Sequence, residues 1–225
     1  MKISWPATIG QYRGRFAVAG IDLSSVDDLT CCVYLIPDPA DRVLVDVLMR
    51  CWCPEAKVYD RKNKYRDQYQ KWEKQGWLHA TEGNAIDYDF VRREIVADAK
   101  VLSLQLVGVD RGFDGVGFSI ALGQDLGHSE KRPVIIGCTN HPAKMGPICQ
   151  EFERRLLEHK INHGNNPILR FMVDSVAVRE DADGNKKPDK DKSQGKIDGV
   201  IALLYALDRL MRSKPQLGIR MPMVA

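Results

Sequence analysis

The sequence lacks the features of several large protein classes. It has no apolar run near the roughly 20 residues that a membrane-spanning helix needs, and its first residues have no long apolar core typical of a secretion signal. It also has no internal repeat and no GxxxxGK[ST] phosphate-binding loop, since the pair Gly195-Lys196 lacks the loop's first glycine and its Ser or Thr. These absences predict a protein of the cytoplasm that is not a complete P-loop ATPase.

The sequence also has little net charge and no pair of cysteines spaced to bind a metal ion. The net charge is +3 and the isoelectric point is about 8.5, which permits a nucleic-acid partner without requiring one. The six cysteines form no CxxC pair, and most lie in apolar runs. We therefore expect reduced, buried thiols and no zinc site. A chain of 225 residues predicts one domain over 1–225, with a core at about 15–212 and a loose tail at 213–225.

Three β-rich segments open the domain, at residues 15–22, 29–37 and 43–52. Pro37, Asp38 and Pro39 mark the turn between the last two. This order predicts a meander of antiparallel strands. Because two of the segments are almost continuously apolar, we expect helices on both faces of the sheet.

The rest of the chain predicts helices that alternate with strands. In the charged helix predicted at 60–75, Tyr65, Tyr69 and Trp72 form one stripe, which we interpret as core packing, and Gly76 is a C-terminal stop. The polar stretch 179–196 contains the turn signal Asp-Gly-Asn and predicts a hairpin or loop. The other predicted elements are helices from Asp87, over 113–123, over about 143–160 and from near Gly195 to about Arg212, with strands over 101–109 and 134–137. The expected fold is mixed α/β.

Three aspartates lie at the ends of predicted elements. Asp22 ends the first strand, Asp110 ends a later strand, and Asp198 lies in the first turn of the last helix. A carboxylate at the edge of an apolar core is costly to bury unless it is paired or binds a metal ion. Three of them are suited to Mg²⁺ or Mn²⁺, and two such ions about 4 Å apart hydrolyse phosphodiesters. Each aspartate alone is also explained as a turn or capping residue.

The sequence segments around these aspartates resemble those of a known family. GIDLSSVDDLT, around Asp22, resembles the opening of the nuclease domain in phage terminase large subunits of the HK97 type, and KIDGVIALLYAL, around Asp198, resembles that family's closing helix. Between them, WLHATEGNAIDYDFV and HGNNPIL resemble further landmarks in the same order. The resemblance extends from about residue 17 to 212 and implies a ribonuclease H-like mixed β-sheet flanked by helices.

The resemblance also implies roles for individual residues. Asp22, Asp110 and Asp198 correspond to the metal-binding, catalytic acids, with Asp22 as the candidate bridge between two ions. Lys196 is a further catalytic candidate, which positions phosphate or tunes the site. Asp28 is a candidate peripheral ligand, although a turn residue is the simpler interpretation. The segment VDRGFD departs from the family pattern, so Asp110 has the weakest motif support of the three acids. Asp114 is a lesser alternative to it. Asp174 stands where relatives often have Asn.

The implied function is metal-dependent cutting of double-stranded concatemeric DNA during phage genome packaging, in the host cytoplasm. The implied partners are DNA, a portal protein, a small terminase subunit and an ATPase motor domain that this sequence lacks. The loop before Asp198 supplies candidate DNA phosphate contacts, and no base-reading motif is present. His163 is a candidate catalytic helper, although a turn or capping role explains it as well. The candidate DNA-binding residues of the loop are Lys186, Lys187, Lys190 and Lys192.

Two alternatives stay open. A Holliday-junction resolvase-like or transposase-like nuclease uses the same fold and acids, but the flanking words resemble terminases more closely. The second alternative is a non-catalytic module that binds DNA or the portal. Such a module does not need the acids Asp22, Asp110 and Asp198, yet all three are present. Half of a sugar-kinase or actin-like ATPase is excluded, because 225 residues do not supply the second matched half.

Overall fold

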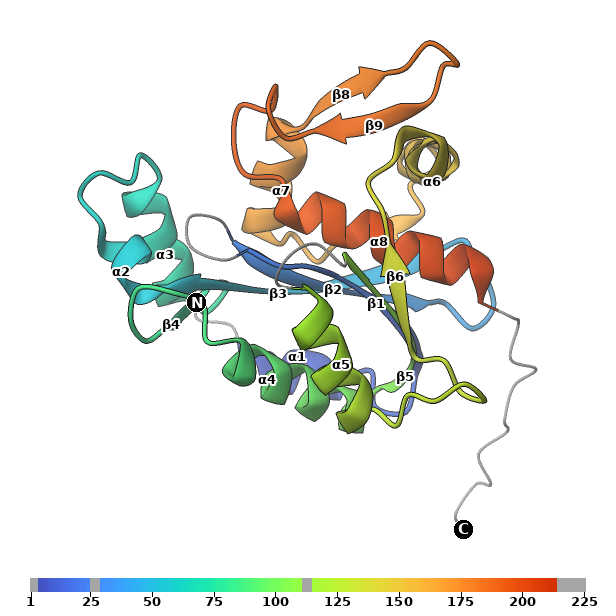
Figure 1. Cartoon of the computed structure of the whole chain (residues 1–225), viewed down its shortest axis with the longest axis horizontal. Coiled ribbons are helices and arrows are strands. Elements are labelled where there is room, and N and C mark those ends of the chain that lie inside the picture. Colours follow the sequence, from blue (N-terminus) through green and yellow to red (C-terminus); the bar gives the residue numbers. More distant parts are fainter. Residues whose placement is uncertain (1–3, 25–28, 111–114, 214–225) are drawn as a thin grey trace.

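The computed structural model describes residues 4–24, 29–110 and 115–213. A central mixed β-sheet has helices on both faces (Figure 1). A small two-stranded hairpin, β8–β9 (residues 177–189), lies beyond the helices of one face. The strands are β1 (Phe16–Asp22), β2 (Thr30–Pro37), β3 (Val45–Pro54), β4 (His79–Thr81), β5 (Ser103–Asp110), β6 (Ile135–Cys138), β7 (Ile161–Asn162), β8 (Ala177–Glu180) and β9 (Lys186–Asp189). The helices are α1 (Trp5–Gly10), α2 (Glu55–Tyr59), α3 (Arg66–Gln75), α4 (Tyr88–Val101), α5 (Gly115–Asp125), α6 (Pro142–Leu157), α7 (Pro167–Ser175) and α8 (Asp198–Arg212).

The sheet has the strand order β4-β3-β2-β1-β5-β6, with β7 also paired to β3. The strands β1, β2 and β3 form the predicted antiparallel meander, while β1, β5 and β6 run parallel. The carboxyl ends of these three parallel strands therefore meet at one edge of the sheet. This arrangement brings residues that lie far apart in the sequence to the same place.

Apolar side chains cover both faces of the sheet, as the continuous apolar strands predicted. Every residue of β2 is buried. On one face, α8 packs across β1, β2 and β5, with α6 and α7 beside it. On the other face lie α1, α4 and α5, which contribute Trp5, Ile95 and Leu122 to a second core. No described helix is long and apolar enough to cross a membrane.

The helix α8 lies directly on β1 because Gly20 has no side chain. A Cβ atom at Gly20 would lie 1.9 Å from the carbonyl oxygen of Ala202 and 2.4 Å from the backbone nitrogen of Ala206. Contacts this short are excluded for real atoms, so glycine is required where this helix crosses the strand. The close packing holds the first turn of α8 near the end of β1.

The helix predicted at 60–75 is shorter than expected. It begins at Arg66, and residues 60–65 form turns instead. Asp60 accepts a hydrogen bond from the backbone nitrogen of Lys62 at 2.8 Å, and Asn63 accepts one from that of Tyr65 at 2.9 Å. Such side-chain bonds compete with helix formation. Gly76 ends α3 with φ of 80°, as predicted.

The other differences lie mainly at element boundaries. The predicted strand at 101–109 begins at Ser103, because α4 continues through Val101. The last helix begins at Asp198, not near Gly195. The polar stretch forms the predicted hairpin, β8–β9. Sequence analysis missed α1, α2, α7, β4 and β7. The predicted tail beyond Ser213, as well as Asp28 and Asp114, lies outside the described residues.

A buried ionic network connects α1, α4 and the sheet. Asp98 on α4 is 2% exposed and accepts hydrogen bonds from Trp5 Nε1 and Tyr34 Oη, both at 2.9 Å. The guanidinium of Arg50 donates to both Asp98 oxygens, at 2.6 and 2.8 Å, and also pairs with Glu94. A charge this deeply buried is tolerated because both members of the pair have several partners.

Candidate active site

Asp22 and Asp110 lie side by side at the carboxyl edge of the sheet. Each is the last residue of its strand, and the preceding residues, Ile21 and Val109, are register partners in the parallel pair β1–β5. Asp22 is 5% exposed, because β2 flanks it on the other side with Cys31 opposite. The placement of both carboxylates follows from two apolar strands that end at the same level.

Asp198 reaches the same edge from above the sheet. It is the first residue of α8 and only 2% exposed. Its oxygen Oδ1 accepts from Lys190, but its oxygen Oδ2 is buried and has no hydrogen-bond partner among the described residues. A buried carboxylate oxygen without a partner is costly, unless a cation or water completes its shell. Asp198 is therefore oriented as an unsatisfied oxygen ligand.

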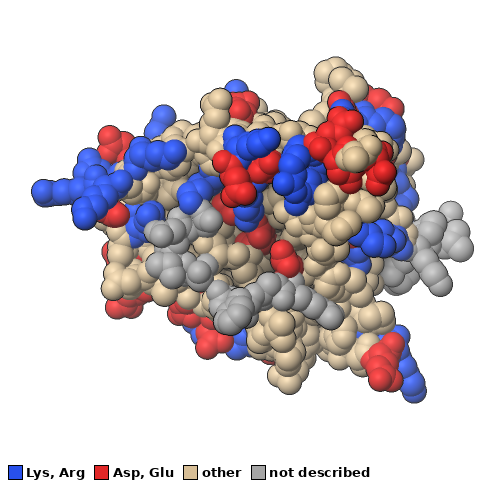
Figure 2. All heavy atoms as spheres, turned by 45° about the horizontal axis from the view of Figure 1, so that its top comes forward, with Lys and Arg blue, Asp and Glu red and all other residues tan. Residues whose placement is uncertain are grey.

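Lys190, just after β9, places its ammonium between the two buried acids. Its Nζ atom lies 2.9 Å from Oδ2 of Asp22 and 3.1 Å from Oδ1 of Asp198. The hairpin thus supplies one positive charge to two carboxylates that come from β1 and α8. Figure 2 shows carboxylates in the middle of this hollowed face, with lysine and arginine side chains around them.

The electrostatics of the site follow from burial and from the crowding of like charges. Burial raises the pKa of Asp22 to about 7; the charge of Lys190 opposes this shift, and the charges of Asp198 and Asp110 add to it. Burial lowers the pKa of Lys190, but the carboxylates of Asp22 and Asp198 outweigh it, so that this pKa is raised overall. The site therefore has a strong affinity for positive charge.

Asp110 has a different set of contacts. The hydroxyl of Tyr205, about two turns into α8, donates to Oδ2 of Asp110 at 3.2 Å. Burial, followed by the charge of Asp110, raises the pKa of Tyr205, so the phenol stays protonated and remains a donor. Tyr205 thereby orients the third carboxylate. No sequence feature singled it out, because it reads as one more apolar residue of the helix.

The carboxylates of Asp22, Asp110 and Asp198 are the kind of ligand that suits Mg²⁺ or Mn²⁺, although their side chains are not arranged around a single point. Among residues 4–24, 29–110 and 115–213, no three His, Cys, Asp or Glu side chains are placed to hold a metal ion together. Carboxylate oxygens are nevertheless the ligands that these hard cations prefer. One oxygen of Asp198, Oδ2, has no partner among the described residues, and the ammonium of Lys190 lies between Asp198 and Asp22.

Lys196 lies beside the acids. It lines a cavity of about 430 Å³ together with Asp198 and Lys190. Lys64 and Tyr65 line the same cavity. A negatively charged group that enters the cavity would therefore meet three lysines as well as the acids Asp191 and Asp198.

The remaining candidate lysines of the hairpin differ in their surroundings. Lys186 is 3.9 Å from Glu153, and Lys187 donates to the backbone oxygen of Asn140 at 3.1 Å. Lys192 is exposed. Lys190 is engaged with Asp22 and Asp198, which the sequence did not predict.

His163 and His128 have surroundings other than the three acids. His163 lines a cavity with apolar residues of α6, α7 and α8, among them Leu169 and Leu203. His128 accepts from the backbone nitrogens of Val134 and Ile135 and so has a structural role. The structure does not bring His163 to the candidate site.

The predicted packing roles of the aromatic stripe and the thiols agree with the structure. Tyr69 and Trp72 are buried and stacked, with ring centres 5.7 Å apart. All six cysteines are free; four are buried, and Cys138 and Cys149 are half-buried.

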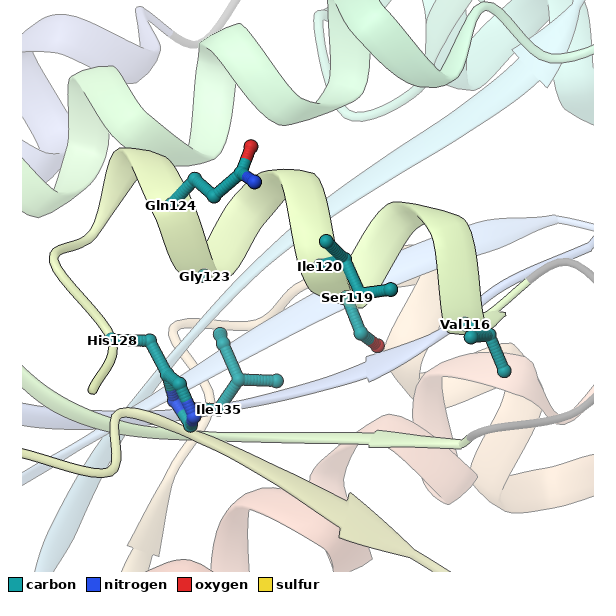
Figure 3. A pocket seen from close by; sticks show the side chains of 7 residues that line it. All are labelled: Val116, Ser119, Ile120, Gly123, Gln124, His128 and Ile135. Atoms are coloured by element: carbon teal, nitrogen blue, oxygen red, sulfur yellow. The ribbon is translucent and has the colours of Figure 1, made fainter. Parts of the chain in front are cut away.

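A separate cavity of about 420 Å³ lies between α5 and β6 (Figure 3). None of its described lining residues is Asp, Glu, Lys or Arg, so these residues supply no carboxylate for a divalent ion and no lysine or arginine for a phosphate. It is lined by Val116, Ser119, Ile120, Gly123, Gln124, His128 and Ile135.

Comparisons with known proteins agree with this geometry. Residues 5–214 match the family described as "Terminase large subunit, endonuclease domain". The terminase large subunit of Enterobacteria phage HK97 is 32% identical over 197 residues, which are 84% of this chain and 36% of that protein. A crystal structure of the HK97 bacteriophage large terminase is similar, with a TM-score of 0.74 and 27% identity, over 92% of this chain and 43% of that chain.

The chain thus spans less than half the length of the HK97 protein it matches. A more distant structure, the large terminase nuclease from thermophilic phage G20c, has 11% identity and a TM-score of 0.50, over 85% of this chain and 81% of that chain, and shows likeness of fold alone. The expected ribonuclease H-like fold is confirmed. With this fold, and with a family match that covers nearly its whole length, the chain belongs to the endonuclease domains of phage terminase large subunits.

Proposed function

We propose that this chain is a metal-dependent endonuclease that cuts double-stranded, concatemeric DNA during phage genome packaging. The observation that carries this proposal is the pair of buried carboxylates, Asp22 and Asp198, that share the ammonium of Lys190, with Asp110 next to Asp22 on the neighbouring strand. Buried acids at a cation-binding edge suit hydrolysis of a phosphodiester. The family of the chain supports the same chemistry.

In this proposal Asp22, Asp110 and Asp198 would hold two Mg²⁺ or Mn²⁺ ions. When bound, such ions supply an activated water for in-line attack and stabilise the leaving oxygen. Tyr205 holds the carboxylate of Asp110 in place through its hydroxyl. Lys196 faces the same cavity as Asp198 and positions a phosphate there.

The proposed DNA contacts of the hairpin are Lys186, Lys187 and Lys192, which bind phosphates and do not read bases. Lys190 belongs to this set only after it has left the acids, because its ammonium is engaged with them here. The proposed partners of the whole terminase are an ATPase motor domain, a portal protein and a small terminase subunit. They would act together with this domain in the host cytoplasm.

The test is cleavage of supercoiled plasmid and linear duplex DNA by the purified chain with Mg²⁺, Mn²⁺ or EDTA. We expect cutting with either metal ion, no cutting in EDTA, and a loss of at least about 100-fold in Asp22→Asn, Asp110→Asn and Asp198→Asn. Asp89→Asn is the control, since Asp89 is an exposed residue of α4 whose side chain pairs with Arg92 and not with the acids.

Other outcomes separate the alternatives. Strong preference for a four-way junction over linear duplex would favour a resolvase-like enzyme. A folded protein that binds DNA but never cuts it would favour a docking module. Equal activity in the wild type and the three acid variants would show that the proposed site is wrong.

A further inference from the structure

The connection between α2 and α3 carries a concentrated positive charge. Residues 57–66 include five Lys or Arg residues and a single acid, Asp60. The carboxylate of Asp60 already accepts a backbone hydrogen bond from Lys62 at 2.8 Å. Figure 2 shows lysine and arginine side chains projecting at the end of the molecule where α2 and α3 lie in Figure 1, on the same face as the acids.

The hairpin, in contrast, offers little net charge. Residues 179–196 contain six Lys or Arg residues and five Asp or Glu residues. Several of its lysines contact protein groups: Lys186 lies near Glu153, Lys187 bonds to Asn140, and Lys190 pairs with the acids. The α2–α3 connection is therefore the stronger attractor for a polyanion on this face.

A direct contact joins this connection to the candidate active site. The hydroxyl of Tyr65 donates to the backbone oxygen of Gln194 at 2.9 Å, across 129 residues of sequence. The ammonium of Lys64 lies 4.7 Å from the centre of the Tyr65 ring. Lys64 and Tyr65 line the 430 Å³ cavity together with Lys196 and Asp198. Positive charge thus continues from the acids to α3.

The connection is anchored by aromatic packing. The ring of Tyr65 lies 6.1 Å from that of Tyr69 and 5.3 Å from that of Phe171 on α7. Trp72 packs against the same Phe171 at 5.5 Å. These rings fix the base of the connection, from which the exposed Lys64 reaches the cavity. Arg61 and Lys62, also exposed, precede it by three and two residues.

We infer that the α2–α3 connection is a second DNA-contact site, at which Arg61, Lys62 and Lys64 bind backbone phosphates of the duplex that flanks the cleavage position. This inference rests on the proposed function for the identity of the polyanion. The chemistry is that of phosphate contacts that position the duplex and carry no sequence information. The contact would orient the DNA so that one strand crosses the cavity toward Asp198.

The experiment compares the triple variant Arg61→Ala/Lys62→Ala/Lys64→Ala with Arg93→Ala/Lys100→Ala/Lys131→Ala. The control removes the same charge from exposed positions on α4 and before β6. Binding to a fluorescent 30-base-pair duplex is measured in EDTA over a series of salt concentrations, so that no cutting takes place. We expect the slope of log affinity against log salt to fall by about 2 to 3 in the α2–α3 variant, since each phosphate contact contributes about 0.9, and to change little in the control.

Binding and cutting are scored separately, with unchanged thermal stability as the check of folding. If wild type cuts DNA and the α2–α3 variant binds with an unchanged slope, the inference is wrong and the proposed nuclease stands. If the slope falls only in that variant but wild type never cuts, the contact site stands and the nuclease does not. Equal losses in both triple variants, or no binding by wild type, would overturn the inference.

Discussion

The Nζ atom of Lys190 lies 2.9 Å from Oδ2 of Asp22, although 168 residues separate the two in the sequence. The same atom is 3.1 Å from Oδ1 of Asp198. One ammonium thereby screens two buried carboxylates whose mutual repulsion, at about 4 Å and an effective dielectric constant of about 20, would be roughly 4 kcal/mol. A divalent ion and this ammonium compete for the same oxygens.

Lys190→Met is therefore expected to bind Mn²⁺ more tightly than the wild type, by about tenfold or more, because a charge-assisted hydrogen bond of roughly 1.5–3 kcal/mol no longer has to be broken. Isothermal titration calorimetry without DNA measures this affinity. Lys187→Met is the control, since Lys187 bonds to the oxygen of Asn140 and not to the acids. Weaker metal binding by Lys190→Met would mean that Lys190 helps to hold the acids in their binding geometry.

The raised pKa of Asp22 predicts a stability that depends on pH. Burial raises this pKa from an ordinary 3.8 to about 7, so the folded protein binds this proton more tightly than the unfolded chain does. The contribution is fully present below about pH 4 and is lost as pH rises to 7 and above. Asp22→Asn, neutral at every pH, is expected to be more stable than wild type at pH 8 in EDTA, by up to about 4 kcal/mol, and equally stable near pH 4.

Urea unfolding at both pH values, with and without Mn²⁺, checks this prediction. Added Mn²⁺ should stabilise the wild type at pH 8 and have little effect on the variant. A stability difference that is the same at pH 4 and pH 8 would contradict an ionisation of Asp22 as its cause.

Gly20→Ala tests the contact that places Asp198 above the sheet. The new Cβ atom would overlap the backbone of α8 at Ala202 and Ala206, so we expect a loss of about 3 kcal/mol or more in the free energy of unfolding. Gly117→Ala is the matched control: it lies in α5 with nothing within 4 Å of the added Cβ, so helix propensity predicts a gain of up to about 1 kcal/mol. Thermal unfolding of both variants measures these changes. A Gly20→Ala variant as stable as the wild type would show that α8 can move away from β1.

The network around Asp98 predicts a large cost when only one partner is removed. Asp98→Leu leaves Arg50, which is 5% exposed, without its main partner, and we expect the free energy of unfolding to fall by about 3–5 kcal/mol. The double variant Arg50→Met/Asp98→Leu should recover part of this loss, because no unpaired guanidinium remains. Chemical denaturation of the two variants measures the difference. A double variant less stable than the single one would show that each residue stabilises the fold independently.

Much of the architecture could be predicted because it depends on local patterns. Apolar runs that end in Asp22 and Asp110 determined two strand ends, and the meander of the first three strands followed from their order. The resemblance of the words around Asp22 and Asp198 predicted the family, which the match over residues 5–214 confirms. The predicted start of α3 was wrong, since the side chains of Asp60 and Asn63 accept backbone hydrogen bonds that compete with the helix, and a periodic pattern does not reveal such bonds.

Local sequence patterns specify which residues carry charge and which strands and helices they end or begin. The position of Lys190 between Asp22 and Asp198, the hydrogen bond from Tyr205 to Asp110 and the packing of α8 on Gly20 depend on the folded arrangement of the whole chain. Apart from the contact between Lys190 and Asp198, which are 8 positions apart, these contacts join residues that lie 95 or more positions apart on different elements. Their geometry depends on how closely helices and strands pack, and the residue types along the chain do not specify that closeness one position at a time.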